Sequence, residues 1–188
     1  MNVKIILVGF ILISIVGYIY FDENEHSDTY YDNGVLKSTG NLHNGYGKFY
    51  SETGFLIYEG YWNNSKFQGQ GILYYDDGYV NGTFDQGLLY GYAESYYGDG
   101  SKMYFGESIA GKYSGYGELY ARNGQLIYQG YWNDSKFQGK GKLYYSNGNL
   151  LYDGYFKSAK YDGKGSLYFE NGSLKYSGEF VEGIYVYS

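Results

Sequence analysis

The chain has 188 residues and a formal net charge of −6, with 31 glycines and 30 tyrosines but no proline and no cysteine. This composition is far from that of an ordinary globular domain, and the lack of cysteine excludes disulfides and thiolate metal sites. One arginine, Arg122, and no basic run argue against nucleic acid and against anionic lipid headgroups, because both bind to clustered Lys and Arg.

The chain begins with a candidate membrane segment. After Lys4, the stretch from Ile5 to Phe21 carries no charge, and the acidic stretch Asp22 to Glu25 follows at once. As a helix this segment would span roughly 25 Å, a little less than the roughly 30 Å hydrocarbon core. Tyr18 and Tyr20 suit the membrane interface and make up the difference.

Three interpretations of this segment stay open: a retained anchor, a cleaved signal peptide, or a buried helix of the folded body. A cleavable peptide has a shorter apolar stretch and a small-residue cleavage site, so a retained anchor is preferred. Lys4 orients the N-terminus toward the cytoplasm. We therefore expect a single-pass membrane protein with an anchor at 1–21, an acidic linker at 22–29 and an extracytoplasmic domain at 30–188. Cleavage would instead give a secreted protein.

The rest of the chain repeats itself. Residues 56–69 return as residues 126–139 with two changes, 70 residues further along the chain. Recurring glycines mark smaller steps of 24, 22, 24, 24 and 24 residues, at Gly45, Gly69, Gly91, Gly115, Gly139 and Gly163. A fixed period of this length indicates a repeat array.

Within each unit, alternate positions share a character, which is typical of strands. Leu143 and Tyr145 would point to one face, and Tyr144 to the other. Asn-Gly pairs between the strands predict turns in which both residues take positive φ. The turn glycines predict about seven hairpins, at Gly34, Gly54, Gly78, Gly100, Gly124, Gly148 and Gly172.

These hairpins predict an all-β fold, an elongated single-layer antiparallel array of about fourteen strands that extends roughly 65 Å. Such a sheet has no second layer, so each unit buries its rings against its neighbours. Glycines in the strands leave room in which Trp62, Trp132, Phe156 and the tyrosines of adjacent hairpins lay their rings. We expect the structural repeat core to comprise Gly60, Trp62, Gly69, Gly71, Gly130, Trp132, Gly139, Gly141, Gly154 and Phe156.

The stretch 58–74 resembles a MORN (membrane occupation and recognition nexus) repeat, because it has the pattern Tyr-x-Gly-x-Trp, a turn with lysine, Gly-x-Gly and a closing aromatic residue. The stretches 128–144 and 152–168 are similar, and the resemblance covers about residues 30–188. Two departures favour the variant repeats common in bacteria: a serine stands where the family has glycine before the lysine, and the linking segment reads Asn-Gly-x-Leu-x-Tyr.

The resemblance to that bacterial branch implies scaffolding, partner binding and, in some members, neutralisation of a cognate toxin. It implies no catalysis by the repeats. The residues agree, because His26 and His43 provide too little material for a triad or a multi-histidine metal site. Asp76 and Asp77 fall in a turn and need no catalytic explanation. We expect no enzyme activity, no metal and no cofactor.

A second set of tyrosines lies, by strand parity, on the face opposite the core. An exposed aromatic row of this kind favours partner binding. Cross-strand packing alone also explains such rings, and both interpretations stay open. The candidate partner-binding residues are Tyr50, Tyr61, Tyr74, Tyr96, Tyr120, Tyr131, Tyr144, Tyr155 and Tyr168.

Together these features predict a non-catalytic, membrane-anchored protein that binds a protein partner outside the cytoplasm, as an immunity or antitoxin-type protein. The partner would be a toxin or an envelope component. Two alternatives remain: a structural spacer or envelope assembly scaffold, and a glycan-binding envelope protein, since rows of rings also suit sugars.

Overall fold

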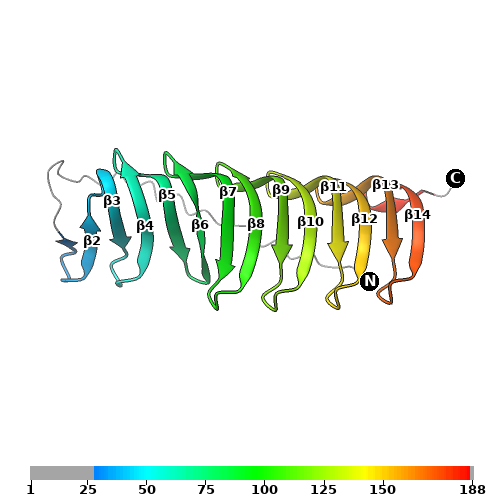
Figure 1. The fold of residues 1–188 in the computed structure, drawn as a ribbon, viewed down its shortest axis with the longest axis horizontal. Coiled ribbons are helices and arrows are strands. Elements are labelled where there is room, and N and C mark those ends of the chain that lie inside the picture. Colours follow the sequence, from blue (N-terminus) through cyan, green and yellow to red (C-terminus); the bar gives the residue numbers. More distant parts are fainter. Residues whose placement is uncertain (1–27, 187–188) are drawn as a thin grey trace.

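The computed structural model describes residues 28–186 and places them in one antiparallel sheet of 15 strands, which follow one another in chain order (Figure 1). The strands are β1 (Thr29–Tyr30), β2 (Leu36–Gly40), β3 (Asn44–Tyr50), β4 (Leu56–Asn63), β5 (Lys66–Tyr75), β6 (Gly78–Asp85), β7 (Leu88–Tyr97), β8 (Lys102–Ile109), β9 (Lys112–Tyr120), β10 (Leu126–Asn133), β11 (Lys136–Tyr144), β12 (Leu150–Lys157), β13 (Lys160–Tyr168), β14 (Leu174–Val181) and β15 (Ile184–Tyr185).

The predicted fold class is confirmed. Strands β1 to β14 pair as seven consecutive hairpins, and the short β15 adds one further strand. Gly78, expected in a turn, belongs to β6. The predicted N-terminal anchor, residues 1–21, lies outside the described residues. Between residues 28 and 186, no helix is long and apolar enough to cross a membrane.

The two long edges of the sheet differ in the kind of connection that joins the strands (Figure 1). The longer loops line one edge, called the loop edge. There the amide of Tyr145 donates to the carbonyl of Asn149 (2.9 Å), and the amide of Gly148 donates to the carbonyl of Tyr145 (3.0 Å). Only the glycine of the Asn147-Gly148 pair has positive φ, at 89°. The expectation that both residues take positive φ was therefore wrong, because the pair closes a longer loop.

Tight two-residue turns line the opposite edge, called the turn edge. Asn64 and Ser65 have φ of 48° and 57°, and Asp134 and Ser135 have 51° and 59°. Positive φ at both central residues is the type I′ geometry, whose twist matches that of the flanking strands. These are the turns where serine stands in place of the family's glycine.

The core lies on one face of the sheet and is built around fully buried tyrosines: Tyr58, Tyr104, Tyr128 and Tyr152. Each ring covers a pair of glycines that face each other across two strands. At Gly71, paired with Gly60, a Cβ would lie 2.1 Å from the hydroxyl oxygen of Tyr58. That hydroxyl donates to the carbonyl of Tyr61 (3.1 Å). Of the rings expected in the room left by these glycines, it is the tyrosine of the same strand that fills it, and Trp62 packs edge-on against that tyrosine.

The remaining core rings pack around each buried tyrosine. Tyr58 stacks on Phe67 with 3.8 Å between ring centroids, and Trp62 meets both rings edge-on. The Trp62 indole donates to the carbonyl of Gly47 (3.3 Å), so its polar atom is satisfied. The same arrangement recurs around Tyr128. Trp62, Trp132 and Phe156 all lie buried in this core.

The expected glycines divide into two groups. Gly60, Gly71, Gly130, Gly141 and Gly154 lie in paired strands beneath buried tyrosine rings. Gly69 and Gly139 have φ of 67° and 65° and lie within the strand irregularities opposite Tyr61 and Tyr131. The first group is therefore required for space, and the second for backbone conformation.

The aromatic core is divided into two clusters. One extends from Leu42 to Ala93, and the other from Tyr104 to Phe180. Between them lie two buried serines, Ser95 and Ser108. Ser108 occupies the position that Trp62 occupies in β4, so the ring packing is interrupted at β7 and β8.

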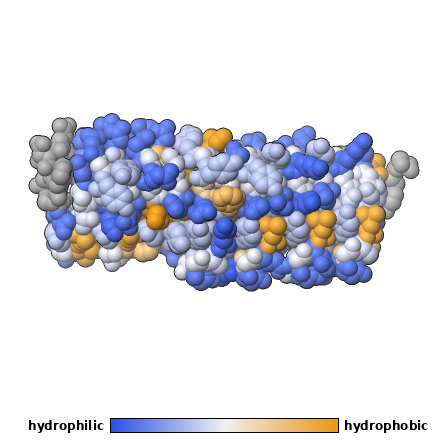
Figure 2. All heavy atoms as spheres, in the orientation of Figure 1, coloured by the Kyte–Doolittle hydropathy of each residue, from blue (hydrophilic) through white to orange (hydrophobic). Residues whose placement is uncertain are grey.

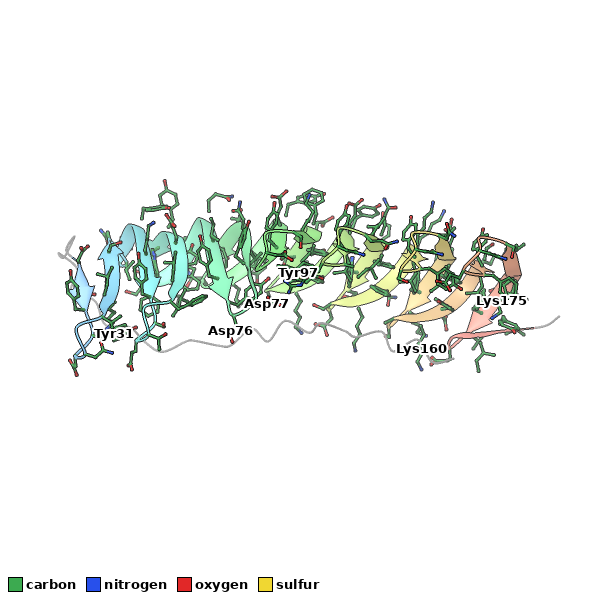
Figure 3. All side chains as sticks on the ribbon, turned by 90° about the horizontal axis from the view of Figure 1, so that it is seen from below. Tyr31, Asp76, Asp77, Tyr97, Lys160 and Lys175 are labelled. Atoms are coloured by element: carbon green, nitrogen blue, oxygen red, sulfur yellow. The ribbon has the colours of Figure 1, made fainter. Side chains whose placement is uncertain are left out.

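A clasp on the loop edge spans this interruption. The Arg122 guanidinium pairs with Asp77 (2.5 Å) and Asp99 (3.3 Å), and it lies 4.6 Å from the ring centroid of Tyr97. Asp77 and Tyr97 lie near the middle of the array in Figure 3. The single arginine of the chain therefore links three successive loops. These loops connect strands that carry residues of both core clusters.

Candidate functional site

The face opposite the aromatic core, called the open face, consists of the strand residues that alternate with the buried ones. In β4, for example, Tyr58 and Trp62 are buried and Tyr61 between them is exposed. On this face Lys48 pairs with Glu59 (3.0 Å), directly across from it in β3. All nine tyrosines proposed for partner binding lie on the open face, in two rows.

The first row crosses the middle of the sheet. Its tyrosines are about half exposed: Tyr61 53%, Tyr131 52% and Tyr155 49%. They directly follow the core glycines Gly60, Gly130 and Gly154. No other ring covers them completely, so they are available to a partner.

The second row runs near the loop edge and is half-buried: Tyr50, Tyr74, Tyr96, Tyr120, Tyr144 and Tyr168. Several of its hydroxyls are already used within the chain. Tyr96 donates to Glu94 (2.7 Å), and Tyr120 donates to Glu118. The hydrogen bond to Glu94, with burial, raises the pKa of Tyr96 to about 12, and burial with the Glu118 hydrogen bond raises the pKa of Tyr120 to about 12. This row therefore contributes to structure as well as to surface.

Further exposed rings on the open face were missed from the sequence. Tyr46 and Tyr116 are exposed and meet Tyr61 and Tyr131 edge-on, with ring centroids 5.4 Å and 5.7 Å apart. Each is the middle residue of a Gly-x-Gly motif. Strand alternation places this middle residue opposite the core, and that is the signal that would have found them.

The centre of the open face carries a third ring pair. Tyr92, another residue next to a motif glycine, is 65% exposed and stacks on Phe105 at 6.2 Å. The Lys102 ammonium lies 5.3 Å from the centroid of the Phe105 ring. Exposed ring pairs thus recur at three places along the open face.

Charged groups are interspersed with the rings. The ammonium of Lys48 and the hydroxyl of Tyr46 both donate hydrogen bonds to Glu59, and they lower the pKa of that carboxyl. In the part of the chain that the structure describes, no group of three or more His, Asp and Glu is placed to hold a metal ion. On the side shown in Figure 2, small hydrophobic patches recur at intervals among hydrophilic residues. The surface is therefore mixed and periodic.

Comparison with known families gives four matches to the MORN repeat, at residues 58–78, 104–126, 128–150 and 152–174. The chain carries MORN repeats. No curated protein sequence matches it.

The four MORN matches begin at the four fully buried tyrosines and end at the first residue of the strand that follows the second strand. Each match therefore covers two strands joined by a tight turn, with the tyrosine that covers the glycine pair as its first residue. The unmatched strands β6 and β7 carry Val80 in place of that tyrosine. The matches thus follow the packing unit of the core. The exposed rings occupy strand positions that alternate with the buried ones.

Proposed function

We propose that this MORN-repeat chain is a non-catalytic module that binds a protein partner along its open face. The observation that supports the proposal is the gathering of exposed rings on that one face: Tyr46, Tyr61, Tyr92, Phe105, Tyr116, Tyr131 and Tyr155. Aromatic side chains bury a large area for little conformational entropy and are enriched at the centres of protein interfaces.

The dimensions of the sheet suit an extended contact. Fifteen strands at about 4.8 Å give an open face roughly 65 Å long. A stable interface buries about 800 Å² on each partner, which corresponds to only part of this surface. A partner that covers two adjacent ring pairs would satisfy that requirement.

The proposal includes the cellular setting. The uncharged segment from Ile5 to Phe21 would hold the chain in a membrane, with the sheet outside the cytoplasm. Resemblance to the bacterial variant repeats supports an immunity or antitoxin-type role there. The partner would then be a toxin or another envelope protein.

Two pairs of substitutions test the proposal. Tyr61→Ser with Tyr131→Ser removes two open-face rings, and Phe55→Ser with Phe169→Ser removes two exposed rings from the loop edge. Chemical crosslinking of membranes that contain each full-length variant, followed by affinity capture, measures partner recovery. We expect at least tenfold less partner with the first pair and unchanged recovery with the second.

Equal recovery from both variants, with folding verified by circular dichroism, would reject binding through the open face. Such a result would favour the spacer or scaffold alternative, in which only the length of the array matters.

A further inference from the structure

A groove of about 430 Å³ crosses the open face near the C-terminal end of the sheet, over strands β11 to β14. It extends roughly 14 Å along the array, since it spans three strand spacings. The backbone of Gly154, Gly165 and Gly178 forms part of its lining. These glycines pair across three adjacent strands, and a Cβ at any of them would point to the core face, so they present only backbone to the groove.

A half-exposed ring lies between two lysines in this groove. Tyr155 is directly opposite Lys140 in the register of β11 and β12. On its other side is Gly163, where a Cβ would lie 3.4 Å from that of Tyr155, and Lys164 follows at once. The two lysines are two strands apart, or about 10 Å.

Neither lysine is neutralised by an ion pair among residues 28–186. Two carboxylates also line the groove: Asp153 pairs with Lys142 (3.7 Å), and Glu179 is directly opposite Lys164 without forming an ion pair with it. The groove thus offers two ammonium groups that form no ion pair with the described residues, although the chain as a whole has a net charge of −6.

We propose that this groove binds an extended acidic segment of the partner protein. Carboxylates of the segment pair with Lys140 and Lys164, and its backbone or an apolar side chain packs on the Tyr155 ring. Alternate side chains of an extended segment lie about 7 Å apart, and flexible lysines bridge that spacing from bases about 10 Å apart. This inference rests on the proposed function, because it names the chemistry of one part of the same surface.

The remaining polar groups limit how acidic the segment is. Glu179 lines the groove beside Lys164, and the Ser166 and Ser177 hydroxyls share a hydrogen bond of 2.9 Å. Because Glu179 is directly opposite Lys164, it weakens the attraction of that lysine for a carboxylate, and Lys140 provides the stronger contact; a peptide amide or hydroxyl beside Glu179 finds partners. The groove therefore favours two spaced carboxylates over a continuous acidic run.

The same features disfavour the two other polyanionic partners. A bilayer would approach the whole open face at once and meet Glu94, Glu107 and Glu118 on it, in an acidic chain with no basic run. Nucleic acid presents phosphates continuously and needs more than two lysines for useful affinity. A protein segment is the one anion whose charges can be confined to a groove of this size.

Fluorescence anisotropy with the full-length chain and a short labelled peptide of alternating glutamate and glycine tests the inference. Lys140→Gln with Lys164→Gln is compared with Lys66→Gln with Lys102→Gln. The control pair changes the net charge equally and lies on the same face, where Lys66 already donates to Gln86 (3.1 Å) and Lys102 lies over Phe105.

We expect the groove pair to weaken peptide binding about tenfold at low salt and the control pair about twofold or less. Tyr155→Ser should weaken it as well, and a peptide with glutamine in place of glutamate should not bind. Equal weakening by the two lysine pairs would overturn the inference, because net charge alone would then explain it. It would also be overturned by tighter binding of phosphatidylserine vesicles or single-stranded DNA that is lost in the groove pair.

Partner capture separates this inference from the function on which it rests. If capture depends on Tyr61 and Tyr131 but the groove pair changes neither capture nor peptide binding, the groove proposal alone fails. If capture is insensitive to every open-face variant while the peptide still binds at the groove, the proposed function fails.

Discussion

Single residues in the tight turns carry measurable backbone strain. Ala159 has φ of 66°, a left-handed conformation that costs a residue with a Cβ roughly 1–2 kcal/mol. Glycine removes this cost but gains roughly 0.4–1 kcal/mol of entropy in the unfolded chain. We therefore expect Ala159→Gly to stabilise the fold by about 0.5–1 kcal/mol, seen as a higher urea midpoint.

Ala121 provides the matched control for that change. It begins a loop, and it is not among the residues with positive φ. The same alanine-to-glycine substitution should destabilise here by about 0.5 kcal/mol. Opposite signs at the two positions support the strain argument, and a loss of stability at both would refute it.

The strand glycines are required for space. A Cβ at Gly130 would lie 2.5 Å from the Cα of Gly141 and 2.6 Å from the Tyr128 hydroxyl. The first contact is with backbone and cannot be relieved by rotation of a side chain. Gly130→Ala should therefore cost about 3 kcal/mol in the free energy of unfolding.

Gly98 tests whether the cost is specific to the core. A Cβ there would meet only Asp77, at 3.2 Å from its exposed carboxylate and at an ordinary contact distance of 3.5 Å from its backbone. Gly98→Ala should change the free energy of unfolding, measured by urea denaturation, by less than about 1 kcal/mol. A similar loss at both glycines would mean that packing under the buried tyrosine is not the cause.

At the scale of the strands, the interrupted core at β7 and β8 predicts a weak joint. A repeat array is stabilised by the interfaces between neighbours, and this joint buries Ser95 where β5 and β9 have leucine and Ser108 where β4 and β10 have tryptophan. Amide hydrogen exchange should be faster in β7 and β8 than in β4 and β5 or in β10 to β12. One uniform exchange rate across the sheet would contradict this expectation.

The Arg122 clasp should partly compensate for that joint. Removing the guanidinium by Arg122→Gln breaks its pairs with Asp77 and Asp99 on the loop edge. We expect faster exchange in β7 and β8 at low salt, with the difference vanishing at high salt because these groups are exposed. Lys175→Gln, another loop-edge cation over a ring, provides the control for general charge effects.

At the scale of the whole molecule, the tyrosine core predicts alkaline unfolding. Burial raises the pKa of Tyr152 to about 12 and also raises the pKa of Tyr58, Tyr104 and Tyr128 from the usual 10.0. The fold therefore favours the neutral phenols. Their contribution to stability is complete below pH 10 and is lost as the pH rises through the raised values.

Absorbance at 295 nm and circular dichroism measure this together. We expect the buried tyrosines to titrate only as the β-sheet signal disappears, near pH 12. Titration of every tyrosine near pH 10 with an unchanged sheet would contradict the buried core.

The hairpin array was predictable because alternation, turn glycines and a fixed period all agree. The loop geometry was not predictable. Asn147 and Gly148 indicate that a turn is present, but they do not determine the length of the loop, which is set by the Tyr145–Asn149 pairing. Tyr58 and Tyr61 are the same residue type and lie on either side of Gly60 in the sequence. Parity separates their faces, but only the packed structure shows that the ring of Tyr58 covers Gly60 and Gly71.

The surface was partly predictable for the same reason. Tyr61, Tyr131 and Tyr155 follow from strand parity, and the same parity would have found Tyr46 and Tyr116, but their pairing with Tyr61 and Tyr131 required the register. Lys140 and Lys164 could not be recognised as binding residues from the sequence, because their lack of ion pairs depends on where neighbouring carboxylates point.

The most direct test of the central claim is site-specific photo-crosslinking in membranes, with a photoreactive phenylalanine analogue placed at one position at a time. If the open face holds the partner, adducts form from Tyr61, Tyr131 and Tyr155, and not from Phe55 or Phe169 on the loop edge. Adducts from the loop edge alone, or equally from both sets, would contradict the account.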